Sequence, residues 1–137
     1  MDTVLVTGGC GYIGSHTCIS LLNNNYNVLI LDSLVNSFNN VNKIKKIAAI
    51  KGIDENERIQ FIKGDLRDNL LLDDIFNNYI RAKKPIKSVI HFAGLKSIFC
   101  SIKSPLKYWD SNVISTLSLL ELIDGTLTYK SRKEYNY

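Results

Sequence analysis

The sequence has few of the residues that mark fibrous, disordered or disulfide-rich proteins. Its 137 residues include 2 prolines and 8 glycines, which excludes collagen-like and proline-rich low-complexity classes. The 3 cysteines form no C-x-x-C pair, so neither a disulfide framework nor a zinc site is indicated. No apolar run approaches the roughly 20 residues of a membrane-spanning helix, and no segment resembles a signal peptide. We therefore expect a cytoplasmic protein with no metal and no membrane partner.

Charge is neither scarce nor concentrated. The net charge is +4, from 17 Lys and Arg against 13 Asp and Glu, and the lysines are spread along the chain. No basic block is interleaved with aromatic residues, so we expect solvated lysines and no nucleic-acid partner. The 45% of hydrophobic residues is enough for one domain with a core.

Short apolar runs alternate with segments of helical spacing. The strand candidates are residues 3–7, 28–31, 59–62 and 88–92. The helix candidates are residues 13–24 and 41–50, a helix capped by Asp68, and a helix that begins at Pro105. Strands that are apolar throughout and separated by helices predict a parallel sheet covered on both faces. The expected fold class is therefore α/β, a doubly wound parallel sheet of the Rossmann type, truncated after about four β-α units.

A glycine motif follows the first expected strand and opens the first helix. Gly9, Gly11 and Gly14 satisfy G-x-G-x-x-G in the context that the motif requires. Such glycines allow a tight turn and let the backbone approach a pyrophosphate at a helix N-terminus. Asp32 ends the second strand, where a carboxylate can bind the ribose hydroxyls of adenosine and would repel a 2′-phosphate. The pair predicts a dinucleotide site that prefers NAD to NADP; the alternative is a structural glycine turn with a capping aspartate.

Three sequence blocks together resemble the UDP-glucose 4-epimerases of the extended short-chain dehydrogenase/reductase superfamily. The blocks are residues 8–17, 91–96 and 105–113, in the order of that family and at roughly its spacing. The resemblance covers about residues 2–123 and implies an NAD-dependent isomerase of galactose metabolism that interconverts UDP-glucose and UDP-galactose. The chain is expected to comprise a partial NAD-binding domain over residues 1–124 and an unmatched polar tail over 125–137. For residues 126–129, a short strand and a frayed end both remain open.

The resemblance also implies which positions bind NAD. Some would contact the pyrophosphate, some the adenosine, and others the nicotinamide or the space beside it. They are Gly8, Gly11, Tyr12, Ile13, Gly14, Asp32, Asn36, Ser37, Asp65, Leu66, Phe92, Ala93, Gly94, Lys96 and Asn112. Each has a plainer alternative, such as a turn aspartate for Asp65, a loop lysine for Lys96 and a surface amide for Asn112.

The family's catalytic elements have no counterpart in this sequence. Its serine-rich block and the helical Tyr-x-x-x-Lys motif are absent in the expected place, so no catalytic residue is assigned. Two literal matches, Tyr79 to Lys83 and Tyr129 to Lys133, fall in the wrong part of the fold. Phe99 and Cys100 also stand where the family has a small-residue loop with glycine and glutamate. We expect a chain that is inactive alone, or else a non-catalytic NAD-binding module or a truncated remnant.

The resemblance implies two partners. A UDP-hexose would bind only if the missing C-terminal part completed the site. A second copy of the chain is a possible partner through the helix at residues 105–123, which helps to form a dimer interface in the family.

Overall fold

The computed structural model describes the backbone of residues 1–134 and the side chains of residues 1–54 and 56–125. The strands are β1 (Thr3–Thr7), β2 (Asn27–Asp32), β3 (Ile59–Lys63) and β4 (Ile86–His91). The helices are α1 (Tyr12–Asn23), α2 (Val41–Ile50), α3 (Glu55–Arg58), α4 (Asn69–Arg81), α5 (Ile98–Lys103), α6 (Pro105–Trp109), the π-helix η1 (Asp110–Ile114) and α7 (Ser115–Glu134). They fall into two units, residues 1–65 with 76–94, and residues 66–75 with 95 onward.

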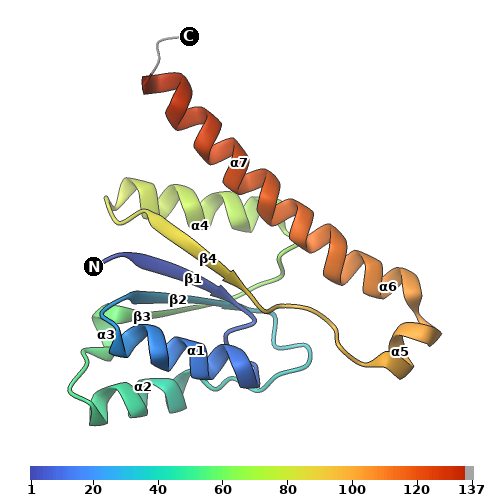
Figure 1. Ribbon diagram of the computed structural model, residues 1–137, viewed down its shortest axis with the longest axis horizontal. Helices are drawn as coiled ribbons and strands as arrows, with labels where there is room; N and C mark the ends of the chain where they lie inside the picture. Colours follow the sequence, from blue (N-terminus) through green and yellow to red (C-terminus); the bar gives the residue numbers. More distant parts are fainter. Residues whose placement is uncertain (135–137) are drawn as a thin grey trace. The chain divides into compact units, whose positions relative to one another are not determined.

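The first unit contains a four-stranded parallel sheet with the strand order β3-β2-β1-β4 (Figure 1). The chain moves outward from β1 through β2 to β3 and then returns to the other side of β1 for β4. The order therefore reverses between β1 and β4, and such switch points are where open α/β sheets bind ligands, outside the carboxyl ends of the strands. The doubly wound parallel sheet expected from the sequence is confirmed.

The two central strands, β1 and β2, are buried on both faces of the sheet, which explains why they are almost entirely apolar, whereas the outer strands β3 and β4 are only partly buried. Val4, Val6, Val28 and Ile30 face a cluster that α1 and α2 complete with Cys18, Leu22 and Ile44, among others. Successive strand residues point to opposite faces, so Leu5, Leu29 and Leu31 lie on the other side. These three leucines are at most 1% exposed. Two-sided burial is typical of parallel sheets and positions the strand ends rigidly.

The second unit contains α5, α6, η1, α7 and the first half of α4. The Oδ1 of Asp68 accepts a hydrogen bond from the Leu71 amide (3.0 Å), as expected for the cap of α4. The helix expected from Pro105 does begin there, but a π-helical segment at Asp110–Ile114 interrupts it. Neither the short strand nor the frayed end considered for residues 126–129 is found, because α7 continues through them to Glu134.

Once a helix has formed, each further residue adds a hydrogen bond without a new nucleation cost, so α7 can continue over Thr and Tyr residues that favour strands elsewhere. The predicted boundary between residues 124 and 125 falls inside α7 and stays a prediction. Residues 135–137 of the predicted tail lie outside the described residues. No helix within residues 1–134 combines the length and the apolar character needed to cross a membrane.

Candidate functional site

The glycine loop between β1 and α1 has no space for side chains. Gly8 has φ +67°, and a Cβ added to it would lie 2.7 Å from the Ala93 nitrogen and 2.8 Å from the Phe92 carbonyl carbon. A Cβ on Gly14 would lie 2.3 Å from the Gly8 carbonyl oxygen. The obstructing atoms belong to the backbone and cannot rotate away. The glycines therefore let the loop press against the end of β4 and the first turn of α1 against the loop.

Helix α1 presents its N-terminus at this loop. Its N-cap residue, Gly11, has no side chain to cap it, and the first turn has no acidic residue within the described residues 12–23. Backbone amides and the positive end of the helix dipole suit an anion at such a position. The Tyr12 and Ile13 side chains are 78% and 63% exposed, and the Tyr12 ring packs edge-on against His16 with 5.0 Å between centroids. The loop and the helix together have the features that a phosphate group requires.

Asp32, at the end of β2, is 6% exposed and lies beside the glycine loop. Its Oδ2 accepts a hydrogen bond from the Cys10 amide (2.9 Å). Its Oδ1 accepts bonds from the Leu34 amide (2.9 Å) and the Ser37 hydroxyl (3.0 Å). A carboxylate has about four acceptor positions, so these bonds hold the group and leave one position on Oδ2.

The loop after β2 is tied to two other segments at this end of the sheet. Asn36 Nδ2 donates to the Gly94 oxygen (3.3 Å), and Asn40 Nδ2 donates to the Cys10 oxygen (2.9 Å). Asn40 does not appear among the residues expected from the sequence, since it belongs to a run of asparagines that reads as a turn. Its bond to the glycine loop identifies it as a residue that holds the loop in place.

The end of β4 is connected to the end of β1. Thr7 and His91 are paired in the sheet register, and Thr7 Oγ1 lies 2.6 Å from His91 Nδ1. The Phe92 amide donates to the Thr7 carbonyl oxygen (3.0 Å), and the Ala93 amide donates to Thr7 Oγ1 (3.4 Å). Burial lowers the pKa of His91, which favours the neutral imidazole in this contact. The segment from Phe92 to Gly94 is thereby fixed against the glycine loop.

The second unit contains the remaining expected site residues, and it is described by itself. Asn112, on η1, grips the backbone of Leu95: its Oδ1 accepts from the Leu95 amide (2.7 Å) and its Nδ2 donates to the Leu95 oxygen (2.8 Å). Lys96 follows directly and is exposed. π-helical segments are frequent at functional sites. Here the segment contains Asn112, whose two hydrogen bonds hold the backbone at Leu95 in place. Leu66 is buried in the same unit.

Neither buried cysteine near the glycine loop has the lowered pKa that favours a reactive thiolate. Burial, with a contribution from the Asp32 charge, raises the pKa of Cys10, and burial raises that of Cys18 to about 12. Tyr79 donates a hydrogen bond from its hydroxyl to Gln60 Oε1 (2.6 Å), and burial raises its pKa, opposite to the change that would help a catalytic base. Tyr129 and Lys133 lie beyond the described side chains.

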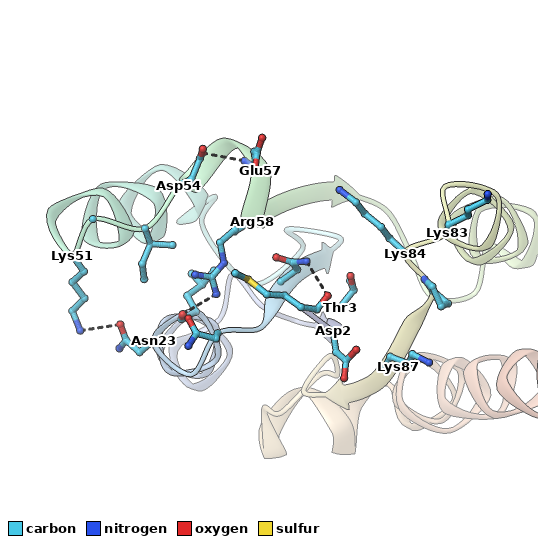
Figure 2. A pocket seen from close by; sticks show the side chains of 17 residues that line it. Asp2, Thr3, Asn23, Lys51, Asp54, Glu57, Arg58, Lys83, Lys84 and Lys87 are labelled. Atoms are coloured by element: carbon cyan, nitrogen blue, oxygen red, sulfur yellow. Dashed lines mark hydrogen bonds between the residues drawn. The ribbon is translucent and has the colours of Figure 1, made fainter.

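A hollow of about 1070 Å³ lies at the opposite, amino end of the strands (Figure 2). Three turns with a left-handed residue border it, at Asn25, Gly52 and Lys83. Each turn closes a helix by the same pair of backbone bonds, for example Lys84 to Tyr79 and Lys83 to Ile80 after α4. The hollow thus marks the place where α1, α2 and α4 end.

Helix C-termini carry partial negative charge, which attracts basic side chains. Arg58 illustrates this, because its Nη2 donates to the carbonyl oxygens of Leu22 (3.0 Å) and Tyr26 (2.8 Å) at the end of α1. Lys51, Lys83, Lys84 and Lys87 also line the hollow, as Figure 2 shows. These cations complement helix ends, and the same helix ends oppose the binding of an anion. The carboxyl end of the sheet is therefore the better candidate site.

The structure brings most of the expected residues together within the first unit. They follow the carboxyl ends of the four strands: Gly8, Gly11, Tyr12, Ile13, Gly14, Asp32, Asn36, Ser37, Asp65, Phe92, Ala93 and Gly94. The other three, Leu66, Lys96 and Asn112, belong to the second unit.

Comparison with known proteins assigns the family. A family model described as GDP-mannose 4,6 dehydratase matches residues 5–136. The chain belongs to the GDP-mannose 4,6 dehydratase family. Among its relatives, a UDP-glucose 4-epimerase from Yersinia pestis is 48% identical over 118 residues, which are 86% of this chain and 32% of that protein. One from Dictyostelium discoideum is 44% identical over 123 residues, or 90% of this chain and 33% of that protein.

Solved structures of UDP-glucose 4-epimerases also match the chain. The UDP-glucose 4-epimerase of Stenotrophomonas maltophila, with bound NAD and formylated UDP-arabinopyranose, matches with a TM-score of 0.74 and 37% identity. That of Bifidobacterium longum, in complex with NAD+ and UDP, has a TM-score of 0.74 and 38% identity. Each match covers 90% of this chain and 34% of the other. The resemblance to UDP-glucose 4-epimerases is confirmed, and the chain spans about a third of the length of these relatives.

Proposed function

We propose that the chain is the NAD-binding part of a UDP-glucose 4-epimerase. The observation that carries the proposal is the glycine loop, where Gly8 and Gly14 exclude side chains beside the N-terminus of α1 and Asp32. This combination offers amides to a pyrophosphate and a carboxylate to a ribose within one rigid unit. The related enzymes of known structure that contain NAD support the choice of cofactor.

The residues present fit NAD. Gly8, Gly11, Tyr12, Ile13 and Gly14 would surround the pyrophosphate. Asp32 has acceptor capacity for a ribose hydroxyl, and its charge would oppose the 2′-phosphate of NADP. The further proposed contacts are Asn36 and Ser37 near that ribose, Asp65 and Leu66 at the adenine, and Phe92, Ala93, Gly94, Lys96 and Asn112 on the nicotinamide and substrate side.

Bound NAD would supply reversible hydride transfer at C4 of a UDP-hexose. In this proposal the chain's own residues bind and orient the cofactor, and the Thr7–His91 contact holds the β4 end in place. The acid–base pair and the UDP-hexose site come from polypeptide outside this sequence. The 137-residue chain alone is accordingly inactive, and UDP-galactose is a substrate only for the completed enzyme.

A second copy of the chain is the proposed partner of α6 and α7. Four apolar side chains on these helices are exposed: Leu106 (82%), Trp109 (60%), Leu117 (48%) and Leu120 (55%). An apolar stripe of this kind commonly marks a protein–protein contact. A dimer formed through these helices would cover the stripe.

Isothermal titration calorimetry of the purified chain with NAD and NADP tests the cofactor assignment. We expect a dissociation constant for NAD below about 1 mM and weaker binding of NADP. Asp32→Asn should weaken NAD binding and reduce the preference over NADP, because the repelling charge is lost. Asp54→Asn is the matched control, since Asp54 caps α3 at the opposite end of the sheet. Absence of NAD binding at millimolar concentration would contradict the proposal.

An assay for conversion of UDP-galactose to UDP-glucose separates the catalytic claim from the binding claim. We expect no turnover by the isolated chain with NAD present. Turnover would show that the acid–base groups are within these 137 residues after all. Binding without turnover agrees with the proposal, and restored turnover after addition of a C-terminal epimerase fragment would exclude a purely non-catalytic NAD-binding module.

A further inference from the structure

Phe38 is the large apolar residue with the greatest exposure among the described side chains, at 87%. It lies in the loop between β2 and α2, at the carboxyl end of the sheet. Exposing a phenyl ring to water is unfavourable by an amount that scales with its apolar area. A ring exposed at this position is available to a ligand that binds at the carboxyl end of the sheet.

The loop around Phe38 is held at several points. On one side Ser37 donates from its hydroxyl to Asp32 Oδ1 (3.0 Å). On the other, Asn39 Oδ1 accepts from the Val41 amide (3.2 Å) and Asn40 donates to the Cys10 oxygen (2.9 Å). The ring therefore projects from a backbone that is held on both sides. A ligand that packs against the ring would need to order little of the loop.

Phe38 is also close to the carboxylate proposed to hold the adenosine ribose. One peptide unit, about 3.8 Å between Cα atoms, separates it from Ser37. Its Cα therefore lies within about 10 Å of the Asp32 carboxylate, a span comparable with a nucleoside. Other exposed apolar side chains follow the same strand ends: Tyr12 (78%), Ile13 (63%), Val35 (69%) and Phe92 (39%). The carboxyl end of the sheet is thus an apolar as well as an anion-binding surface.

We infer that Phe38 is a stacking platform for the adenine ring of the bound dinucleotide. The inference rests on the proposed NAD site and adds to it a contact absent from the expected set. A purine offers a flat π-face to an aromatic side chain, and such stacks contribute to affinity without demanding a particular hydrogen-bond pattern. Ser37 links the proposed ribose contact at Asp32 to the proposed adenine contact at Phe38, because its hydroxyl donates to the Asp32 carboxylate and it directly precedes Phe38 in the sequence.

Calorimetry with fragments of the cofactor tests this inference. Phe38→Ala should weaken the binding of NAD and ADP-ribose by about 5- to 100-fold, the range for a lost base–aromatic stack. Binding of nicotinamide mononucleotide, which has no adenine, should change less than twofold by this reasoning. Phe38→Trp should retain affinity, and Phe38→Leu should lose most of it, because leucine supplies apolar surface but no aromatic face.

The control variant is Ile50→Ala, which removes another exposed side chain (85%) at the end of α2, away from the carboxyl end of the sheet. It should leave all affinities unchanged. Thermal melting of each variant checks that the fold is retained. Unchanged ADP-ribose affinity in Phe38→Ala, or full affinity in Phe38→Leu, overturns the stacking role while the NAD site stands. Failure of the unmodified chain to bind NAD overturns the proposed function and this inference together.

Discussion

Replacing Gly8 by alanine should destabilise the chain for two separable reasons. The first is its left-handed backbone, φ +67°, which is unfavourable for a residue with a Cβ by about 1–2 kcal/mol. The second is steric, because the new Cβ would meet the Ala93 nitrogen at 2.7 Å and the Phe92 carbonyl carbon at 2.8 Å. Relieving such overpacking typically costs about 1–3 kcal/mol. Together they predict a loss of about 2–5 kcal/mol in the free energy of unfolding.

Gly52→Ala separates these two contributions. Gly52 has nearly the same backbone angle, φ +71°, but nothing lies within 4 Å of its added Cβ. Urea denaturation followed by circular dichroism should show a smaller loss for Gly52→Ala, and the difference should be the steric share, about 1–3 kcal/mol. The entropy change of the unfolded chain is common to both variants and cancels. Equal losses in the two variants would refute the close contact between the glycine loop and the end of β4.

Three further predictions concern other parts of the structure. Arg58→Met should lower the free energy of unfolding by about 1–3 kcal/mol, because two carbonyl oxygens at the end of α1 lose their donor. In the same urea titration Lys84→Met should lower it by less, at most about 1 kcal/mol, because only a charge near a helix C-terminus is lost. Burial holds the pKa of folded His91 below the 6.5 of the unfolded state, so the unfolded chain takes up a proton first as the pH falls. The free energy of unfolding should therefore be highest above pH 6.5 and decrease below it, and a pH series with His91→Gln should show a flatter profile. Leu117→Lys should shift sedimentation velocity toward the monomer, and an unmodified chain that is monomeric at all concentrations would contradict the proposed dimer.

The parts of the fold that depend on local pattern are predictable from the sequence. The four strands begin and end within about two residues of the expected runs. Continuous apolar character marks β1 and β2, the two strands that are buried almost throughout. The position of Asp32 beside the glycine loop follows from the same pattern, because adjacent parallel strands end at one edge of the sheet. The hydrogen bond from the Cys10 amide to the Asp32 carboxylate confirms that the two segments are adjacent.

The contacts that fix the site could not be predicted in the same way. Asn40 and Cys10 are 30 positions apart, Asn36 and Gly94 are 58 apart, and Thr7 and His91 are 84 apart. Such pairs can be predicted only when the strand order is known. No local sequence feature distinguishes Asn40 from the neighbouring asparagines. The strand order β3-β2-β1-β4 explains the Thr7–His91 pair, which lies at equal height on adjacent strands.

The π-helical interruption of the helix that begins at Pro105 also could not be predicted from the sequence pattern. A π-helical segment adds one residue to a turn and keeps the apolar spacing on either side nearly intact, so periodicity does not reveal it. Its consequence is visible only in the structure, where Asn112 makes two hydrogen bonds to the backbone of Leu95.

A titration of the ¹⁵N-labelled chain with NAD, followed by amide chemical shifts, tests most directly where the cofactor binds. The account predicts shifts concentrated in the carboxyl-end loops, at residues 8–15 and 32–40. The amides that border the amino-end hollow, at residues 23–27, 51–54 and 83–87, should remain unchanged. Shifts concentrated at the amino-end hollow, with the glycine loop unaffected, would contradict the central claim that this chain binds NAD at the carboxyl ends of its strands.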